Sequence, residues 1–188
     1  WVHSETSDVL LERLGRGESH MVIGRVVERH DSSLLRFERL ADEPVSVILR
    51  SGHPLLSAQD LSLPRLQKMQ WVVPPVGSVL RYPFDQMWRQ AGLEAPQVLI
   101  ESASLLFITR MLQESDFIAV VATDIARYYA QNDMVTILPM DLPCEMEAFG
   151  LILRKDRLLS PAAMKVLTAL RRTASAMYGV SLRDDVCE

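Results

Sequence analysis

Small hydroxyl side chains stand at the start of one segment, ESASLLFITRMLQ, residues 101–113. Ser102, Ala103 and Ser104 come directly before an apolar run that begins at Leu105. The run predicts a largely buried helix, and the first turn of such a helix has backbone N–H groups without partners inside the helix. A serine side chain can cap one of these groups, and an anionic ligand can accept hydrogen bonds from others. The residues leave both roles open, and the two roles are compatible.

The rest of the chain carries no established sequence pattern for catalysis or metal binding. It contains no G-x-S-x-G, P-loop, complete G-x-G-x-x-G or H-E-x-x-H motif, and its acidic residues are scattered. Its four histidines are not spaced as metal ligands usually are; they are His3, His20, His30 and His53. We therefore expect no catalytic residue, no metal and no cofactor, and a protein that binds rather than catalyses.

Composition and charge fit an ordinary globular protein. The 188 residues, 48% hydrophobic and 23% charged, can form one domain or two small lobes with a core. The net charge of −4 does not favour nucleic acid as a direct partner, and no apolar run could span a membrane. Cys144 and Cys187 lie far apart, which favours a reduced cytoplasmic setting over a disulfide framework. A redox role for Cys144 finds no support, because no neighbouring residue indicates a lowered thiol pKa.

Hydrophobic periodicity predicts strands that alternate with helices. The predicted helices are 8–15 (or to Gly17), 61–67, 78–92, 105–113, 124–131 and 161–177, the last capped by Ser160 with Pro161 in its first turn. The predicted strands are 20–24, 71–75, 97–101, 117–121, 134–138 and 147–154. Residues 34–50 are predicted to form two extended segments separated by residues 41–44.

This alternation predicts an α/β fold with largely parallel sheets. The strand at 147–154 and the final helix most simply return to the first group of elements, which gives two lobes. We expect a first lobe at 1–70, a second lobe at 71–143, a return to the first lobe at 144–178 and a flexible tail at 179–188. A cleft between such lobes would lie at the carboxyl ends of strands, where helix N-termini point inward.

Five segments occur in an order and spacing that resemble a known family. They are TSDVLLERLGRGESHMVIGR, DEPVSVILRSGHPL, VVPPVGSVLRYPFDQMWRQAGL, ESASLLFITRMLQ and LSPAAMKVLTALRR. Over residues 4–175 the chain resembles the effector-binding domain of LysR-type transcriptional regulators, in the branch of galactose-binding-protein and protocatechuate-pathway regulators. The resemblance implies a type II periplasmic-binding-protein-like fold with a small-molecule inducer between two lobes. The family's first lobe normally begins with a further strand and helix, which this chain lacks.

The resemblance also implies partners. A full-length regulator contacts DNA through an N-terminal winged helix-turn-helix, which is missing from this sequence, so this chain alone is not expected to bind DNA. Family members assemble as homodimers or homotetramers, and the matching helices here are 7–15 and 79–91. No membrane partner is expected.

Further ligand contacts are implied by the resemblance, and each has a plainer alternative. Beside Ser102, Ala103 and Ser104, the expected contacts are Thr6, Ser7, Gly77, Ser78, Phe107 and Thr123. The first two could instead cap their helix, and the glycine and serine at 77–78 could form an ordinary turn. Core packing is the favoured alternative for Phe107.

The expected function is inducer sensing, in which a small anionic metabolite binds to the regulatory domain of a cytoplasmic regulator. The alternative is a periplasmic-type solute-binding protein of a transporter, which shares the fold. An enzyme built on similar lobes would need a convergent acid, base or nucleophile, and the sequence shows none.

Overall fold

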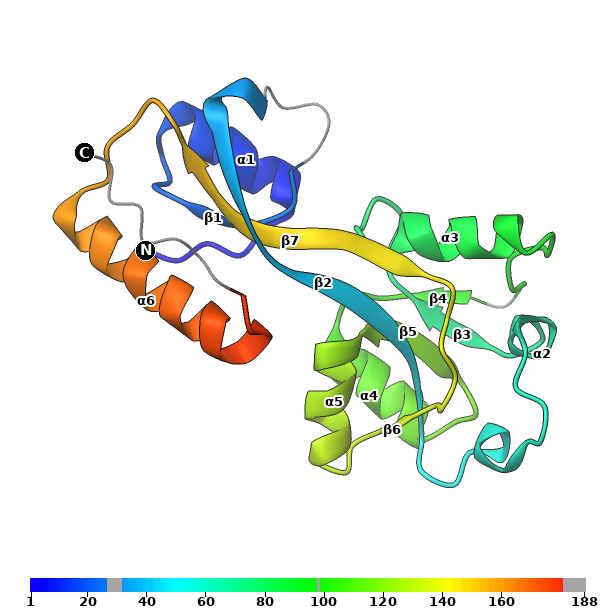
Figure 1. Ribbon diagram of the computed structural model, residues 1–188. Helices are drawn as coiled ribbons and strands as arrows, with labels where there is room; N and C mark the ends of the chain where they lie inside the picture. Colours follow the sequence, from blue (N-terminus) through cyan, green and yellow to red (C-terminus); the bar gives the residue numbers. More distant parts are fainter. Residues whose placement is uncertain (27–31, 98, 181–188) are drawn as a thin grey trace. The chain divides into compact units, whose positions relative to one another are not determined.

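Figure 1 shows the computed structural model, which describes residues 1–26, 32–97 and 99–180. The chain divides into two compact units. Unit 1 comprises Trp1–Asp42 and Glu147–Glu188, and unit 2 comprises Glu43–Met146. Within the described residues, no helix is both long enough and apolar enough to cross a membrane.

The bounds of these units differ from those of the expected lobes. Residues 43–70 were expected in the first lobe but belong to unit 2, because Val47, Leu55 and Leu66 are buried in the same core as Trp71. The predicted strand at 147–154 and the final helix lie in unit 1. Most of the predicted flexible tail, as well as Cys187 and His30, lies outside the described residues.

Unit 1 is a short sheet with a helix on each face (Figure 1). Its strand order is β1-β7-β2, and β1 pairs antiparallel with β7, with Ile23 opposite Leu151. Alternate strand residues pack toward α1 and toward α6, which produces two separate apolar clusters. The elements are α1 (Ser7–Arg16), β1 (Val22–Gly24), η1 (Ser32–Leu34), the first half of β2 (Leu35–Leu49), most of β7 (Glu145–Arg154) and α6 (Pro161–Tyr178).

Unit 2 contains a mixed sheet with the strand order β2-β5-β3-β4, and β6 also pairs with β2. The strands β4, β3 and β5 are parallel, whereas β2 runs antiparallel to β5 and to β6. The expectation of largely parallel sheets is therefore met only by β3, β4 and β5. The further elements are η2 (Pro54–Ser57), α2 (Leu63–Gln67), β3 (Trp71–Val73), α3 (Arg81–Gln90), β4 (Leu99–Glu101), α4 (Leu105–Gln113), β5 (Ile118–Ala122), α5 (Thr123–Gln131) and β6 (Thr136–Ile137).

Helix α3 covers one face of this sheet, while α4 and α5 cover the other (Figure 1). The rings of Trp71, Phe84 and Trp88 meet edge to face, with centroids 5.1–6.0 Å apart. These rings are fully buried within unit 2, so the apolar stripe of α3 is a core feature.

The parallel strands set the position of the helix N-termini. Because β3, β4 and β5 run in one direction, their carboxyl ends lie at one edge of the sheet. Helix α5 begins directly after β5, whereas α4 and α3 follow the ends of β4 and β3 after short loops. This carboxyl edge of unit 2 therefore gathers helix N-termini and their preceding loops.

Two predicted elements required correction. Residues 35–49 form one continuous strand, β2, instead of two segments separated at 41–44. The helix predicted from residue 78 begins at Arg81, because residues 77–80 form a turn with Gly77 at a φ of +86°.

Candidate ligand-binding site

The loop between β4 and α4 is built by its two serines. The hydroxyl oxygen of Ser104 accepts a hydrogen bond from the backbone N–H of Phe107 at 3.4 Å, so Ser104 caps α4. The hydroxyl oxygen of Ser102 accepts one from the N–H of Ser104 at 3.1 Å. The N–H of Ser102 donates to the carbonyl of Val73 on β3 at 3.0 Å. The serine cluster thus has a capping role.

The caps leave part of the helix start without partners. In the described part of the chain, no acceptor contacts the backbone N–H groups of Leu105 or Leu106. Both groups belong to the first turn of α4, where the helix dipole places partial positive charge. The side chain of Leu106 is 75% exposed. The start of α4 can therefore donate hydrogen bonds to an anion from outside.

The loop between β3 and α3 lies at the same edge. The N–H of Ser78 donates to the carbonyl of Pro75 at 3.1 Å, which closes the turn around Gly77. The hydroxyl oxygen of Ser78 is buried and has no hydrogen-bond partner among the described residues. An unpaired buried hydroxyl costs about 1–3 kcal/mol. Among the described residues, Ser78 thus places a buried hydroxyl without a partner at this edge of the sheet.

Sequence reasoning missed the ionic cluster that joins these two loops. The guanidinium of Arg81 contacts the carboxylates of Asp85 and Glu101 at 3.0 and 2.7 Å, and its side chain is only 12% exposed. The hydrogen bond with Glu101 raises the pKa of Arg81 and lowers that of Glu101. The spacing of Arg81 and Asp85, four residues apart on one helix, was the available signal.

The remaining predicted residues of unit 2 have mixed environments. The hydroxyl of Thr123, the first residue of α5, bonds to the hydroxyl of Ser46 on β2 at 2.9 Å. The favoured core role of Phe107 is wrong, because its side chain is 41% exposed at the start of α4. Ala103 is exposed in the serine loop. The structure therefore brings the predicted residues of unit 2 to one edge of its sheet.

Two predicted contacts lie in unit 1, at the start of α1. Thr6 occupies the cap position but makes no side-chain capping bond, so its suggested capping role is wrong. The hydroxyl oxygen of Ser7 accepts a hydrogen bond from the N–H of Arg25 at 3.3 Å.

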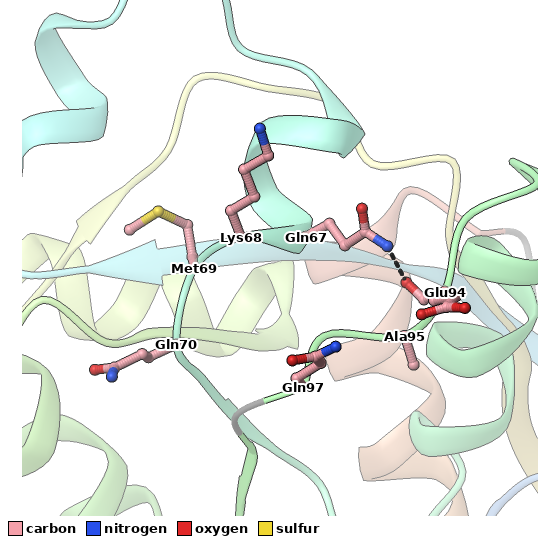
Figure 2. Close-up of a pocket in the computed structure, with 7 residues that line it drawn as sticks. All are labelled: Gln67, Lys68, Met69, Gln70, Glu94, Ala95 and Gln97. Atoms are coloured by element: carbon pink, nitrogen blue, oxygen red, sulfur yellow. Dashed lines mark hydrogen bonds between the residues drawn. The ribbon is translucent and has the colours of Figure 1, made fainter.

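A pocket of about 470 Å³ lies at the opposite edge of the unit 2 sheet, before β3 and β4 begin. Figure 2 shows the amide of Gln67, which donates to the carbonyl of Glu94 at 2.7 Å. None of the predicted ligand contacts lines this pocket. Its lining residues are Gln67, Lys68, Met69, Gln70, Glu94, Ala95 and Gln97.

Metal and thiol chemistry find no support in the described residues. They contain no cluster of three His, Cys, Asp or Glu side chains that could hold a metal ion. His53 is buried, and its two ring nitrogens contact the N–H of Leu55 and the carbonyl of Asp116. Burial, and then the charge of Glu145, raises the pKa of the Cys144 thiol to about 11.

Comparison with known proteins identifies the family. The family profile described as LysR substrate binding domain matches residues 1–175. The chain is 35% identical over 168 residues to the HTH-type transcriptional regulator GbpR of Azospirillum brasilense, covering 89% of this chain and 49% of GbpR. It is 34% identical over 165 residues to the regulator GalR of Pseudomonas putida, covering 88% of this chain and 41% of GalR. The chain therefore spans about half the length of these curated relatives or less.

A solved structure shares the fold. The BenM effector-binding domain with its effector benzoate superimposes with a TM-score of 0.71 and 16% identity, covering 99% of this chain and 82% of that one. The extent of the profile match and the identity to GbpR confirm the resemblance found in the sequence. This chain belongs to the family of LysR substrate-binding domains.

Proposed function

We propose that this chain is the ligand-sensing domain of a LysR-type DNA-binding regulator, and that the carboxyl edge of unit 2 binds an anionic group of a small metabolite. The observation that carries the proposal is the start of α4, where the N–H groups of Leu105 and Leu106, beside two serines, have no acceptor among the residues that the structure describes.

The chemistry of this edge suits a carboxylate. Its oxygens would accept from the free N–H groups of α4 and from the hydroxyl of Ser104, whose oxygen already accepts from Phe107. Proximity to the helix N-terminus would stabilise the negative charge by about 0.3–1 kcal/mol. The exposed ring of Phe107 would contact the apolar part of the ligand. Benzoate, the effector of BenM, combines these two features and is a rational first probe.

The regulatory role is supported by the relatives. GbpR and GalR are named as transcriptional regulators, which favours regulation over solute transport. DNA would be contacted by a separate winged helix-turn-helix of the full-length regulator, and the assembly would work in the cytoplasm without catalysing a reaction. Assembly through helices 7–15 and 79–91 stays a prediction. Exposed Val9 on α1 and Tyr82 on α3 are the apolar side chains that such contacts could cover.

Titration calorimetry tests the ligand assignment. Wild type would be titrated with benzoate and with gluconate, a sugar acid, and then compared with the Ser102→Val/Ser104→Val variant. We expect the variant to lose at least about tenfold in affinity, because it lacks the hydroxyl of Ser104 that would donate to the carboxylate and both serine hydrogen bonds that shape the loop. Unchanged affinity in the variant would contradict the proposal.

A matched control separates binding from stability, because removing the Ser104 cap costs about 1 kcal/mol by itself. Ser160 caps α6 in unit 1, where its hydroxyl oxygen accepts from the N–H of Ala163 at 3.2 Å. Ser160→Val should therefore lower the free energy of unfolding by a similar amount but leave the affinity unchanged.

A further inference from the structure

The guanidinium of Arg81 ties three segments of unit 2 together. Its Nε donates to both carboxylate oxygens of Asp85 at 3.0 Å, within α3. Its Nη1 donates to the carbonyl of Pro74, just after β3, at 3.1 Å. The same nitrogen donates to Oε1 of Glu101, the last residue of β4, at 2.7 Å. These bonds hold the planar group in one orientation.

The contact with Glu101 reaches the serine loop directly. Glu101 immediately precedes Ser102 in the chain. The N–H of Ser102 in turn bonds to Val73. The loop is thus anchored from the β3–α3 side at two consecutive residues, and a shift of residues 102–104 would strain these bonds.

The charge of Arg81 is already matched by carboxylates. One guanidinium faces Asp85 and Glu101, so the cluster carries one positive and two negative charges. A cluster with a net negative charge does not attract an anion. Its contribution to an anion site is therefore geometric rather than electrostatic.

We propose that Arg81 is a positioning residue, which holds the β4–α4 loop in its ligand-binding conformation through Glu101 without contacting the ligand. The inference rests on the proposed function for the place where the ligand binds. Loss of the anchor should lower affinity roughly tenfold, as losses of outer-shell partners do at other preorganised sites.

The test compares four variants of the whole chain. Arg81→Met removes the guanidinium and its hydrogen bonds. Arg81→Lys keeps the positive charge, but its single ammonium cannot reach Asp85, Pro74 and Glu101 at once. Glu101→Leu removes the acceptor, whereas Glu101→Gln keeps an amide oxygen that can accept from Arg81. Arg110→Met is the matched control, because Arg110 forms an exposed ion pair with Glu114 on α4.

Two readouts are required. Amide hydrogen exchange of residues 102–107 reports the loop without any ligand. Calorimetry with benzoate and gluconate reports affinity. We expect faster loop exchange and roughly tenfold weaker binding in Arg81→Met, Arg81→Lys and Glu101→Leu, and partial rescue of both in Glu101→Gln. The control Arg110→Met should match wild type.

The outcomes separate the two proposals. Unchanged loop exchange in Arg81→Lys and Glu101→Leu overturns the role of Arg81, whatever the ligand. Full affinity in Arg81→Lys also overturns it, because charge alone would then suffice. If wild type binds neither probe, the proposed ligand class fails, and the exchange data alone decide whether Arg81 positions the loop. If Arg81→Met does not fold, the lysine and Glu101 variants carry the test.

Discussion

Arg171 on α6 donates two hydrogen bonds to the carboxylate of Glu38 on β2, at 2.9 and 2.6 Å, across 133 residues of sequence. The two side chains are only 6% and 9% exposed. Arg36 contacts the same carboxylate at 3.0 Å. This nearly buried cluster fastens the last helix to the sheet of unit 1, beside the apolar contacts of Leu40 and Leu167.

Glu38→Leu is expected to destabilise the chain by roughly 3 kcal/mol, because the buried guanidinium of Arg171 would lose its carboxylate. Urea unfolding followed by circular dichroism measures the loss. The double variant Glu38→Leu/Arg171→Met should be more stable than Glu38→Leu alone, since the buried guanidinium that has lost the Glu38 carboxylate is then removed as well. A double variant that is no more stable than Glu38→Leu would contradict this account. Glu12→Ala, which breaks an exposed pair with Arg16, should cost under about 1 kcal/mol.

Local signals correctly placed the start of α6 and the end of α1, although the Gly77–Ser78 signal placed the start of α3 too early. The cap at Ser160 and the proline at 161 placed the start of α6, and Gly17 in the left-handed conformation ends α1. Each of these residues acts on the backbone next to it in the sequence, so a short segment contains everything that fixes the helix end. The same holds for Ser104, whose capping bond reaches only three residues ahead.

Long-range partners could not be predicted in this way. Pro44 suggested a break in residues 34–50, but the pairing of Val45–Ile48 with β5 keeps β2 continuous. The contacts of Arg81 with Glu101 and of Arg171 with Glu38 join residues 20 and 133 positions apart. The residues near either arginine in the sequence do not indicate which distant carboxylate it contacts. The core role favoured for Phe107 was wrong because a helical apolar pattern does not show which face of the helix remains uncovered.

Gly150→Ala is expected to cost about 1–3 kcal/mol, because β7 passes very close to β2 at this position. A Cβ at Gly150 would overlap the carbonyl oxygen of Glu38 and lie 2.6 Å from the ring of Phe37. The backbone oxygen cannot move without disturbing the sheet. Thermal unfolding measures the loss. Gly15→Ala on helix α1 is the control, since its Cβ would meet no atom of the described residues within 4 Å, and it should stabilise by about 0.5–1 kcal/mol. Equal effects of the two substitutions would refute the steric explanation.

Cys144 is expected to be unreactive in the folded chain. Burial raises the pKa of its thiol to about 11, so only about one thiol in a thousand is ionised at pH 8. In a Cys187→Ser background, iodoacetamide should modify Cys144 far more slowly in native buffer than in urea. Mass spectrometry of quenched samples gives the two rates. Similar rates would show that the thiol is accessible and would reopen a redox role.

The stabilising effect of Glu101 is expected to disappear in acid. The hydrogen bond from Arg81 is the main cause that holds the pKa of Glu101 below its ordinary value of 4.5; desolvation opposes it, and the N–H of Val76 adds to the lowering. A carboxyl whose folded pKa is depressed stabilises the folded chain fully above its unfolded pKa, and this effect is lost as the pH falls through the lower folded value. The thermal unfolding midpoint of wild type should therefore be higher than that of Glu101→Gln at pH 7, and the two midpoints should converge below pH 4.5. Glu114→Gln, which alters an exposed pair, should follow wild type throughout. A constant difference between wild type and Glu101→Gln from pH 7 to pH 3 would mean that the ionised carboxylate contributes nothing, and that the amide fails for a steric reason.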